Sequence, residues 1–369
     1  MILIIGYKLI NVTKTFLPPF EEYITILKRA WDKGWITNRG ELVKELEEKL
    51  KAYLGVKHLL FCNNGTIALQ IALKALNITG EVITTPFSYV ATTGVILWEN
   101  CTPVFVDIDE NSFCIDASKI EGAITGKTSA ILATHVFGHP CDMDTIQTIA
   151  DKYNLKVIYD GAHAFGTQYK GNSVFNYGNV STCSFHATKL FHTAEGGCII
   201  TNDYSLMEQM TLHHQFGHMA DDHFCMGING KSSELHAAMG LCNFNYIGGI
   251  SKTRKEQWLY YQTLFKDSGL QLLKIKDENE FNYAYFPVVF KTEELLLETT
   301  ALLKEKEIMP RRYFYPSLNT LPYIKYTPSP VSEGIAKKVL CLPLYHQLDK
   351  KDQLMIAEIV LQCEKQLAE

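Results

Sequence analysis

The sequence lacks the features that mark several common classes of protein. Its ten cysteines are scattered from Cys62 to Cys363 without any CxxC spacing. This excludes zinc ribbons, thioredoxin-like redox pairs and a small disulfide scaffold, and we expect reduced, mostly buried thiols. No GxGxxG turn follows the first predicted strand, which argues against a Rossmann-like nucleotide oxidoreductase.

Long hydrophobic runs are also absent. No window reaches the roughly 18 to 20 uncharged apolar residues that a membrane-spanning helix needs, and the apolar run at residues 1–6 is short and has no basic residue before it. A formal net charge of −5 gives no overall attraction for polyanions. We therefore expect a cytoplasmic protein that binds neither membranes nor nucleic acid.

What is present indicates a two-domain α/β protein. A chain of 369 residues with 47% hydrophobic and 20% charged residues is long enough for two cores. From about residue 57 to 201, apolar β-rich runs alternate with helical patterns, and several are too uniformly apolar for a sheet with one wet face. The predicted strands are His58 to Cys62, Glu81 to Thr85, Pro103 to Val106, Ser129 to Thr134, Leu155 to Tyr159, Val180 to Phe185 and Gly197 to Thr201.

Polar and aromatic residues follow the ends of these strands, where ligands bind in open parallel sheets. Between the first two strands, Thr66 to Leu76 is apolar nearly all round, which predicts a buried helix after a tight turn at Asn63-Asn64-Gly65. The residues that we expect to converge at this edge of the sheet are Asn63 to Thr66, Phe87, Tyr89, His135, Asp160 and Lys189.

The segment Ser184-Phe185-His186-Ala187-Thr188-Lys189, followed by Glu195-Gly196-Gly197, indicates a pyridoxal 5′-phosphate (PLP) site when taken with Asp160. A PLP enzyme needs a lysine to hold the cofactor aldehyde as a Schiff base and a carboxylate to keep the pyridine nitrogen protonated. Lys189 and Asp160 fit these roles. The plainer alternatives are a solvated lysine and an aspartate that caps the next helix.

Three further positions fit the same cofactor. Gly65 and Thr66 at a helix start suit a phosphate, although Thr66 could simply cap that helix. The Ser184 and Thr188 hydroxyls could bind the same phosphate, although such residues also occur at turns. Tyr89 is placed to stack on a flat ring or, alternatively, to pack in the core.

On these motifs the chain resembles the DegT/DnrJ/EryC1/StrS family of sugar aminotransferases, PLP enzymes of fold type I. The resemblance runs from about Asn11 onward. Other segments that carry it are Gly65 to Leu69, Pro86 to Thr92, Val104 to Asp109, Asp160 to His163, Gly227 to Lys231, Glu234 to Gly240 and Cys341 to Leu344. It implies a large domain with a mostly parallel seven-stranded sheet at residues 11–245, and a smaller C-terminal α/β domain at 246–369.

The resemblance also implies roles for single residues. Lys189 and Asp160 would be catalytic, Tyr89 would stack on the PLP ring and His163 would lie beside it. Gly65, Thr66 and Ser184 would bind the phosphate. Asn229 would reach the phosphate region of the neighbouring subunit, so that a homodimer shares its active sites. No metal is expected.

The implied activity is transfer of an amino group from L-glutamate to a nucleotide-linked keto-6-deoxy sugar, with dTDP-4-keto-6-deoxyglucose first, for surface polysaccharides such as O-antigen. The alternatives are a 3-keto sugar aminotransferase of the same family and a non-catalytic regulator that binds PLP or a nucleotide sugar. The family often has arginine where His214 and Lys231 stand and histidine where Asn319 stands. Arg311 and Arg312 could contact a diphosphate or lie solvated on the surface.

Overall fold

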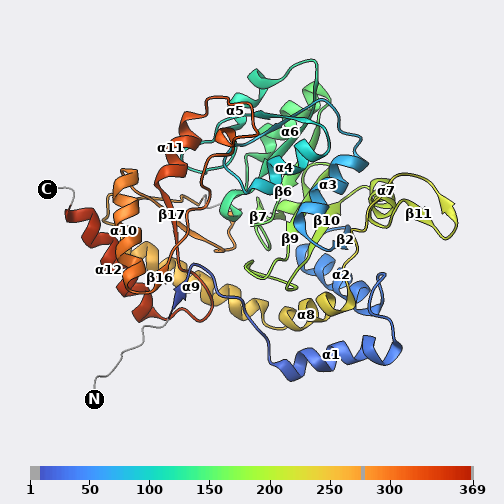
Figure 1. Cartoon of the computed structure of the whole chain (residues 1–369), viewed down its shortest axis with the longest axis horizontal. Coiled ribbons are helices and arrows are strands. Elements are labelled where there is room, and N and C mark those ends of the chain that lie inside the picture. The colour runs from blue at the N-terminus through green and yellow to red at the C-terminus, as the bar shows by residue number, and fades with distance from the viewer. Residues whose placement is uncertain (1–8, 276–278, 367–369) are drawn as a thin grey trace.

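The computed structural model describes residues 9–275 and 279–366, so the apolar run at residues 1–6 lies outside the described part. A seven-stranded sheet forms its centre (Figure 1). Within that sheet only β10 is antiparallel to its neighbours, so the predicted mostly parallel α/β fold is confirmed. In spatial order the strands are β2 (His58–Cys62), β10 (Gly197–Thr201), β9 (Val180–Ser184), β6 (Lys156–Asp160), β5 (Thr128–Thr134), β3 (Glu81–Thr84) and β4 (Thr102–Phe105).

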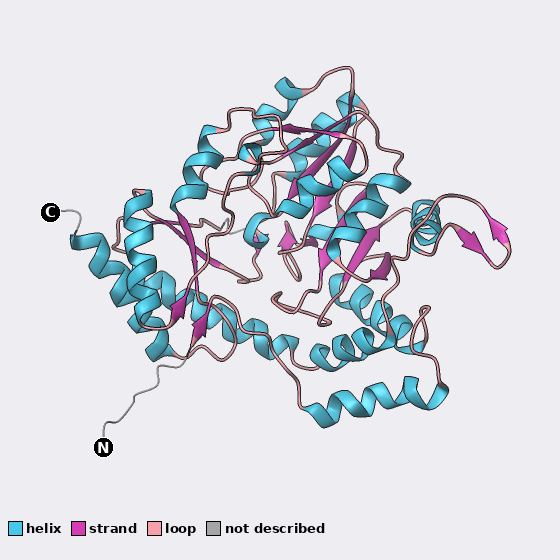
Figure 2. Ribbon diagram, viewed as in Figure 1, coloured by secondary structure: helices cyan, strands magenta, loops and turns pink. Residues whose placement is uncertain are grey.

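All seven predicted strands are present, within a residue at either end. Both faces of the sheet are buried, which explains their uniformly apolar sequences. In β2, Leu59 and Phe61 pack into one cluster of core residues, whereas Leu60 and Cys62 pack into another. Helices therefore cover the sheet on both sides (Figure 2). On the Leu60 face lie α3 (Gly65–Ala75), α4 (Val90–Trp98) and α7 (Tyr204–His214), and on the Leu59 face lie α2 (Glu41–Leu54), α6 (Met143–Tyr153) and α8 (Glu234–Phe244).

A smaller three-stranded sheet follows in the C-terminal part of the chain. Its order is β13 (Gln271–Leu272), β15 (Phe286–Val289) and β17 (Val339–Leu342). In Figure 1 this part lies on the left with α10 (Glu293–Glu305) and α12 (Lys350–Gln366). We propose a domain boundary near residue 245, because α8 ends at Phe244 and the long helix α9 (Ile247–Phe265) leads into the smaller part.

The remaining elements are short or peripheral. Helix α1 (Phe20–Lys33) lies along α8 at the bottom of Figure 1. The others are α5 (Ala117–Ile120), α11 (Pro330–Lys338), β1 (Ile10–Asn11) paired with β16 (Ile308–Met309), the hairpin of β11 (His218–Met219) and β12 (Asp222–His223), and the sheet of β14 (Asn279–Glu280), β7 (Gln168–Tyr169) and β8 (Asn172–Ser173).

All ten cysteines are free, and all but Cys225 are buried, as expected. Across the described residues, no helix is both long and apolar enough to cross a membrane.

Two contacts tie the C-terminal part to the edge of the central sheet. The Asp107 carboxylate, just after β4, accepts hydrogen bonds from the backbone amides of Val331 (2.9 Å) and Ser332 (2.8 Å) at the start of α11. The amide of Leu318 donates to the carbonyl oxygen of Pro86 (2.8 Å). The segment at residues 311–329 is thereby held beside the strand ends.

Candidate active site

One pocket collects nearly all of the residues predicted for the site. It opens at the carboxyl ends of the central strands, where the rule for parallel sheets places ligands. Its walls include Gly65, Thr66, Tyr89, Asp160, His163, Ser184 and Lys189, together with Thr188. Within the single chain, Asn229 does not line it.

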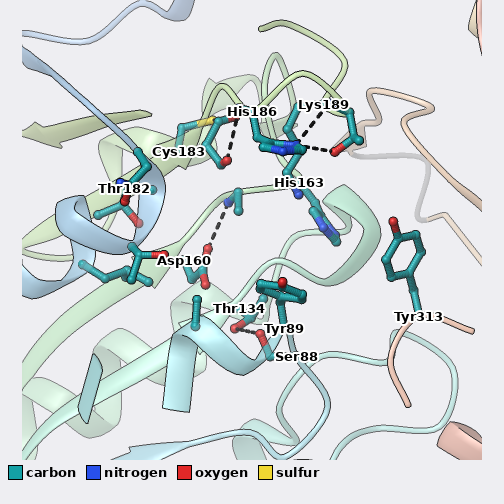
Figure 3. Close-up of a pocket in the computed structure, with 18 of the residues that line it drawn as sticks. Ser88, Tyr89, Thr134, Asp160, His163, Thr182, Cys183, His186, Lys189 and Tyr313 are labelled. Carbon is teal, nitrogen blue, oxygen red and sulfur yellow. Dashed lines mark hydrogen bonds between the residues drawn. The ribbon is translucent and has the colours of Figure 1, made fainter. Parts of the chain in front are cut away.

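The Asp160 carboxylate is fixed at the floor of the pocket. It ends β6, is 5% exposed, and accepts from the Ala162 amide through Oδ1 (3.0 Å) and from the Thr92 hydroxyl through Oδ2 (2.7 Å). Thr92 in turn shares a hydrogen bond with Ser88 (2.7 Å), which contacts Thr134 (3.1 Å). Figure 3 shows Asp160, Thr134 and Ser88 along one side of the pocket. Asp160 therefore does not cap a helix. A chain of hydrogen-bonded hydroxyl groups from Thr134, Ser88 and Thr92 ends at its Oδ2 and orients the carboxylate.

Sequence reasoning missed this hydroxyl chain. Its signal is a pair of threonines, Thr92 and Thr93, in α4, a helix otherwise made of apolar residues and one glycine. Thr92 lies one turn after Ser88, where a buried hydroxyl needs hydrogen-bond partners, and its partners are Ser88 and the Asp160 carboxylate. Both threonines are fully buried.

Lys189 lies on the opposite side of the pocket, in the turn after β9 (Figure 3). Burial lowers its pKa to about 8, and the nearby charge of Arg311 acts in the same direction while Asp160 opposes it. The side chain forms no hydrogen bond to another described residue. Lys189 is thus a partly buried amine that is about half neutral near pH 8, not a solvated surface lysine.

The N-terminus of α3 forms a third wall. Asn64, not Thr66, caps this helix, because the Asn64 side chain accepts from the Ile67 amide (2.8 Å). The Thr66 hydroxyl is therefore not used as the cap. A Cβ at Gly65 would lie 3.1 Å from the Cβ of Ser184, so glycine permits the close approach of this turn to the end of β9. The free amides and the helix dipole here suit a phosphate.

His163 and Tyr89 provide flat surfaces on the pocket. His163 packs against Tyr285 (ring centroids 4.4 Å apart) and Phe314 (5.5 Å). Burial, with a smaller contribution from the charge of Lys189, holds the pKa of His163 well below its usual range, so its ring is neutral at pH 7. Its buried Nδ1 has no hydrogen-bond partner among the described residues. Tyr89 as a whole is 55% exposed, so its ring can contact a ligand and is not packed in the core.

The C-terminal part supplies the remaining wall through Arg311, Tyr313 and Phe314. In Figure 3, Tyr313 comes from a separate segment across the pocket from Asp160. Arg312 does not line the pocket. It forms an ion pair with Glu293 (2.6 Å) and donates to backbone carbonyl groups near the end of α11. The two adjacent arginines therefore differ, and only the first is available to a ligand here.

Several other candidates lie elsewhere. Phe87 and His135 are fully buried outside the pocket walls, and His135 stacks on Tyr159 (4.8 Å). Asn319 is fully buried and bound by Glu333 (2.6 Å), so it stabilises its own loop. His214 and Lys231 line a separate surface hollow with Arg39. Asn229 is exposed just after the protruding hairpin of β11 and β12 (Figure 1).

Comparisons with known proteins agree with this geometry. Residues 20–361 match the model of the DegT/DnrJ/EryC1/StrS aminotransferase family. The chain is 42% identical over 368 residues to the dTDP-4-amino-4,6-dideoxy-D-glucose transaminase of Escherichia coli, a match that covers 96% of this chain and 98% of that protein. The structure of DesI, determined in the presence of its TDP-sugar product, has a TM-score of 0.92 at 30% identity, over 98% of this chain and 95% of that chain. The PLP form of Spr1654 from Streptococcus pneumoniae has a TM-score of 0.90 over 98% of this chain and 100% of that chain, but its 23% identity shows a common fold alone.

Proposed function

The chain belongs to the DegT/DnrJ/EryC1/StrS aminotransferase family, and on that premise we propose that it transfers the amino group of L-glutamate to a nucleotide-linked keto-6-deoxy sugar, with PLP as cofactor. We propose dTDP-4-keto-6-deoxyglucose as the acceptor, because the E. coli relative is a dTDP-4-amino-4,6-dideoxy-D-glucose transaminase and DesI has a TDP-sugar product. The amino sugar would serve surface polysaccharide synthesis.

The observation that carries this proposal is the placement of Lys189 and Asp160 on opposite sides of one pocket. The donor groups around them fit PLP. The α3 N-terminus with Gly65, Thr66 and Ser184 would hold the phosphate, Asp160 would pair with the pyridine nitrogen, and the exposed Tyr89 ring would stack on its face. The unpartnered Nδ1 of His163 provides a further polar contact. When bound, PLP would supply an aldehyde that takes up the amine and a ring that accepts electrons.

The remaining chemistry belongs to the side chains. Lys189 would remove the proton from the α-carbon of glutamate and later donate one to the sugar carbon, since an amine with a pKa of about 8 exchanges protons readily near neutral pH. The Asp160 carboxylate, oriented by Thr92, would pair with the pyridine nitrogen and keep it protonated. Neutral His163 would add no charge beside the ring.

We further propose a homodimer that shares its active sites. Asn229 lies outside the pocket of its own chain, on a segment beside a hairpin that extends away from the body. In a dimer this segment would reach the phosphate region of the partner. The expected cytoplasmic location remains a prediction.

The direct test is an assay of the purified protein with dTDP-4-keto-6-deoxyglucose and L-glutamate. Mass spectrometry should detect the amino sugar, and NMR should place the new amine on C4. Lys189→Ala is the control and should yield no product. The proposal fails if neither this sugar nor its 3-keto, UDP- or GDP-linked counterparts are aminated.

A further inference from the structure

Lys189 projects from a short loop that follows β9. This lysine loop (residues 186–192) is closed at its base by a hydrogen bond from the Thr193 amide to the Phe185 carbonyl oxygen (2.9 Å). A long, flexible side chain on a loop presents its amine at one place only if the loop itself is fixed. The position of the Lys189 amine therefore depends on what contacts the outside of the lysine loop.

Two adjacent residues near the N-terminus hold the lysine loop on either side of Lys189. Just before Lys189, the carbonyl oxygen of Ala187 accepts a hydrogen bond from the Thr15 hydroxyl (3.0 Å). Just after it, the His192 ring donates through Nε2 to the carbonyl oxygen of Phe16 (2.7 Å). The two contacts span 172 and 176 positions of sequence, so they arise from the fold and not from the local chain.

The histidine in this pair is buried and neutral. His192 is 2% exposed. Because a carbonyl oxygen can only accept, its proton lies on Nε2, and Nδ1 accepts from the Ala194 amide (3.1 Å). Burial, with a smaller contribution from the charge of His186, lowers the pKa of His192, while the bond to Phe16 opposes this. The ring therefore keeps both hydrogen bonds at pH 7 and above, and the Asn243 side chain donates to the His192 carbonyl oxygen as well (2.9 Å).

The segment that makes these contacts is itself anchored. This N-terminal strap (residues 10–16) begins with Ile10, which pairs with Ile308 in the two-stranded sheet of β1 and β16. The carbonyl oxygen of Val12 then accepts from the Leu344 amide (3.0 Å). Both anchors belong to the C-terminal part of the chain, so the strap runs from that part to the lysine loop.

We propose that the N-terminal strap positions Lys189 for reaction with PLP, with Thr15 and His192 as the positioning residues. This rests on the proposed function, because it assumes that Lys189 takes up PLP. Neither Thr15 nor His192 lines the pocket, so both act through the lysine loop, which keeps the amine buried and aimed into the pocket. Misplacing a reacting group by about 1 Å can slow its reaction on the order of 100-fold.

Thr15 and His192 contribute no charge beside Lys189. Thr15 is uncharged, and His192 is neutral at pH 8. Replacing either by an apolar residue therefore leaves the charges around the amine as they are, and a change in the pKa of Lys189 then reports a change in its position and burial. The groups whose charges act on Lys189 are Asp160, Cys183, Tyr89 and Arg311.

The test measures the rate of PLP uptake by the full-length apoprotein across pH 6.5 to 10.5 in the His192→Leu variant. The wild-type rate should rise through about 8, the pKa of Lys189. Without the His192 contact, water should reach the amine and shift this midpoint upward by about one pH unit, toward the 10.5 of a solvated lysine. Uptake at pH 7 should then be about tenfold slower. Hydrogen exchange of the apoprotein should also increase at residues 186–192.

Three further variants separate positioning from stability. His192→Gln keeps a donor for the Phe16 carbonyl oxygen and should restore the wild-type midpoint. Thr15→Val should give a smaller shift in the same direction, and it carries the test if His192→Leu does not fold. Thr201→Val is the matched control, since the Thr201 hydroxyl donates to the carbonyl oxygen of Asn179 (2.8 Å) at the end of the central sheet away from the pocket. It should lower the melting temperature without shifting the midpoint.

Three results overturn the proposal. A folded His192→Leu protein with the wild-type midpoint shows that the strap does not position Lys189, even if residues 186–192 exchange faster. An equal shift in Thr201→Val shows that the effect follows lost stability alone. An unchanged midpoint in Thr15→Val removes Thr15 from the proposal. If the wild-type protein takes up no PLP at any pH, the proposed function itself fails, and exchange at residues 186–192 still shows whether the strap holds the loop.

Discussion

The hydroxyl group of Thr92 donates a 2.7 Å hydrogen bond to Oδ2 of Asp160, across 68 positions of sequence and inside the protein. It joins the first turn of α4 to the end of β6. Since the other carboxylate oxygen is bound by the Ala162 amide, the carboxyl group is held in one orientation before any ligand arrives. Preorganisation of this kind spares a catalytic carboxylate from reorganising when charge develops nearby.

Thr92→Val should weaken PLP binding by about 10- to 100-fold, because a hydrogen bond to a charged group contributes about 1.5–3 kcal/mol. Thr93→Val is the matched control. Thr93 is also fully buried in α4, but its hydroxyl has no partner among the described residues, so this change should leave PLP affinity unchanged. Equilibrium dialysis of PLP measures both. Equal effects of the two substitutions would show that Thr92 acts only through packing.

The rate at which the apoprotein takes up PLP should rise with pH through about 8. The reaction needs the neutral amine of Lys189, and burial lowers its pKa from 10.5 to about 8. Between these two values the unfolded chain holds a proton that the folded apoprotein has lost, so this group also makes the apoprotein more stable as pH increases. Stopped-flow absorbance and denaturant unfolding across pH 7 to 11 measure the two effects. A Lys189→Met apoprotein with the same pH dependence of stability would contradict the assignment.

Mixed dimers test the proposed sharing of sites. Asn229→Ala and Lys189→Ala should each be inactive alone, because every site in such a homodimer lacks one group. A mixed dimer contains one site with both groups, so mixing the variants should restore about a quarter of wild-type activity if subunits reassort at random. Activity is measured after mixing, unfolding and refolding. No recovery in a mixture shown to contain mixed dimers would contradict a shared site.

Asp107→Ala should loosen the segment that carries Arg311, since Asp107 binds two amides at the start of α11. The loss of such a cap costs about 0.5–2 kcal/mol of stability. Asp109→Ala is the matched control, because within the described parts of the chain the Asp109 carboxylate accepts hydrogen bonds only from the nearby amides of Asn111 and Ser112. Hydrogen exchange should increase at residues 311–329 in the first variant alone. Equal exchange there in both variants would show that Asp107 does not hold this segment.

The sequence was sufficient to predict the central sheet because its strands are buried on both faces and read as continuous apolar runs. It also predicted that Lys189 and Asp160 line one pocket, since both lie at the carboxyl ends of parallel strands in one sheet. The sequence left open whether Thr66 only caps the helix, because asparagine and threonine are both good caps, and the backbone geometry shows that Asn64 is the cap.

Other parts of the site depend on contacts between distant segments. Thr92 contacts Asp160 only because the first turn of α4 lies beside the end of β6. Arg311 lines the pocket only because the C-terminal part of the chain folds back onto the edge of the central sheet. Because Arg311 and Arg312 are adjacent in the sequence, the sequence could not show which of them lines the pocket and which pairs with Glu293. Asn319 is a similar case, since its burial against Glu333 follows from the fold of a loop with no regular pattern.

The most direct test of the central claim is the visible absorbance of the purified protein with PLP, before and after addition of L-glutamate. If Lys189 holds the cofactor, the wild-type protein should show a visible band that glutamate bleaches, and folded Lys189→Ala should show no such band and no turnover. A folded, dimeric wild-type protein without the band, or a Lys189→Ala variant that retains turnover, would contradict the account.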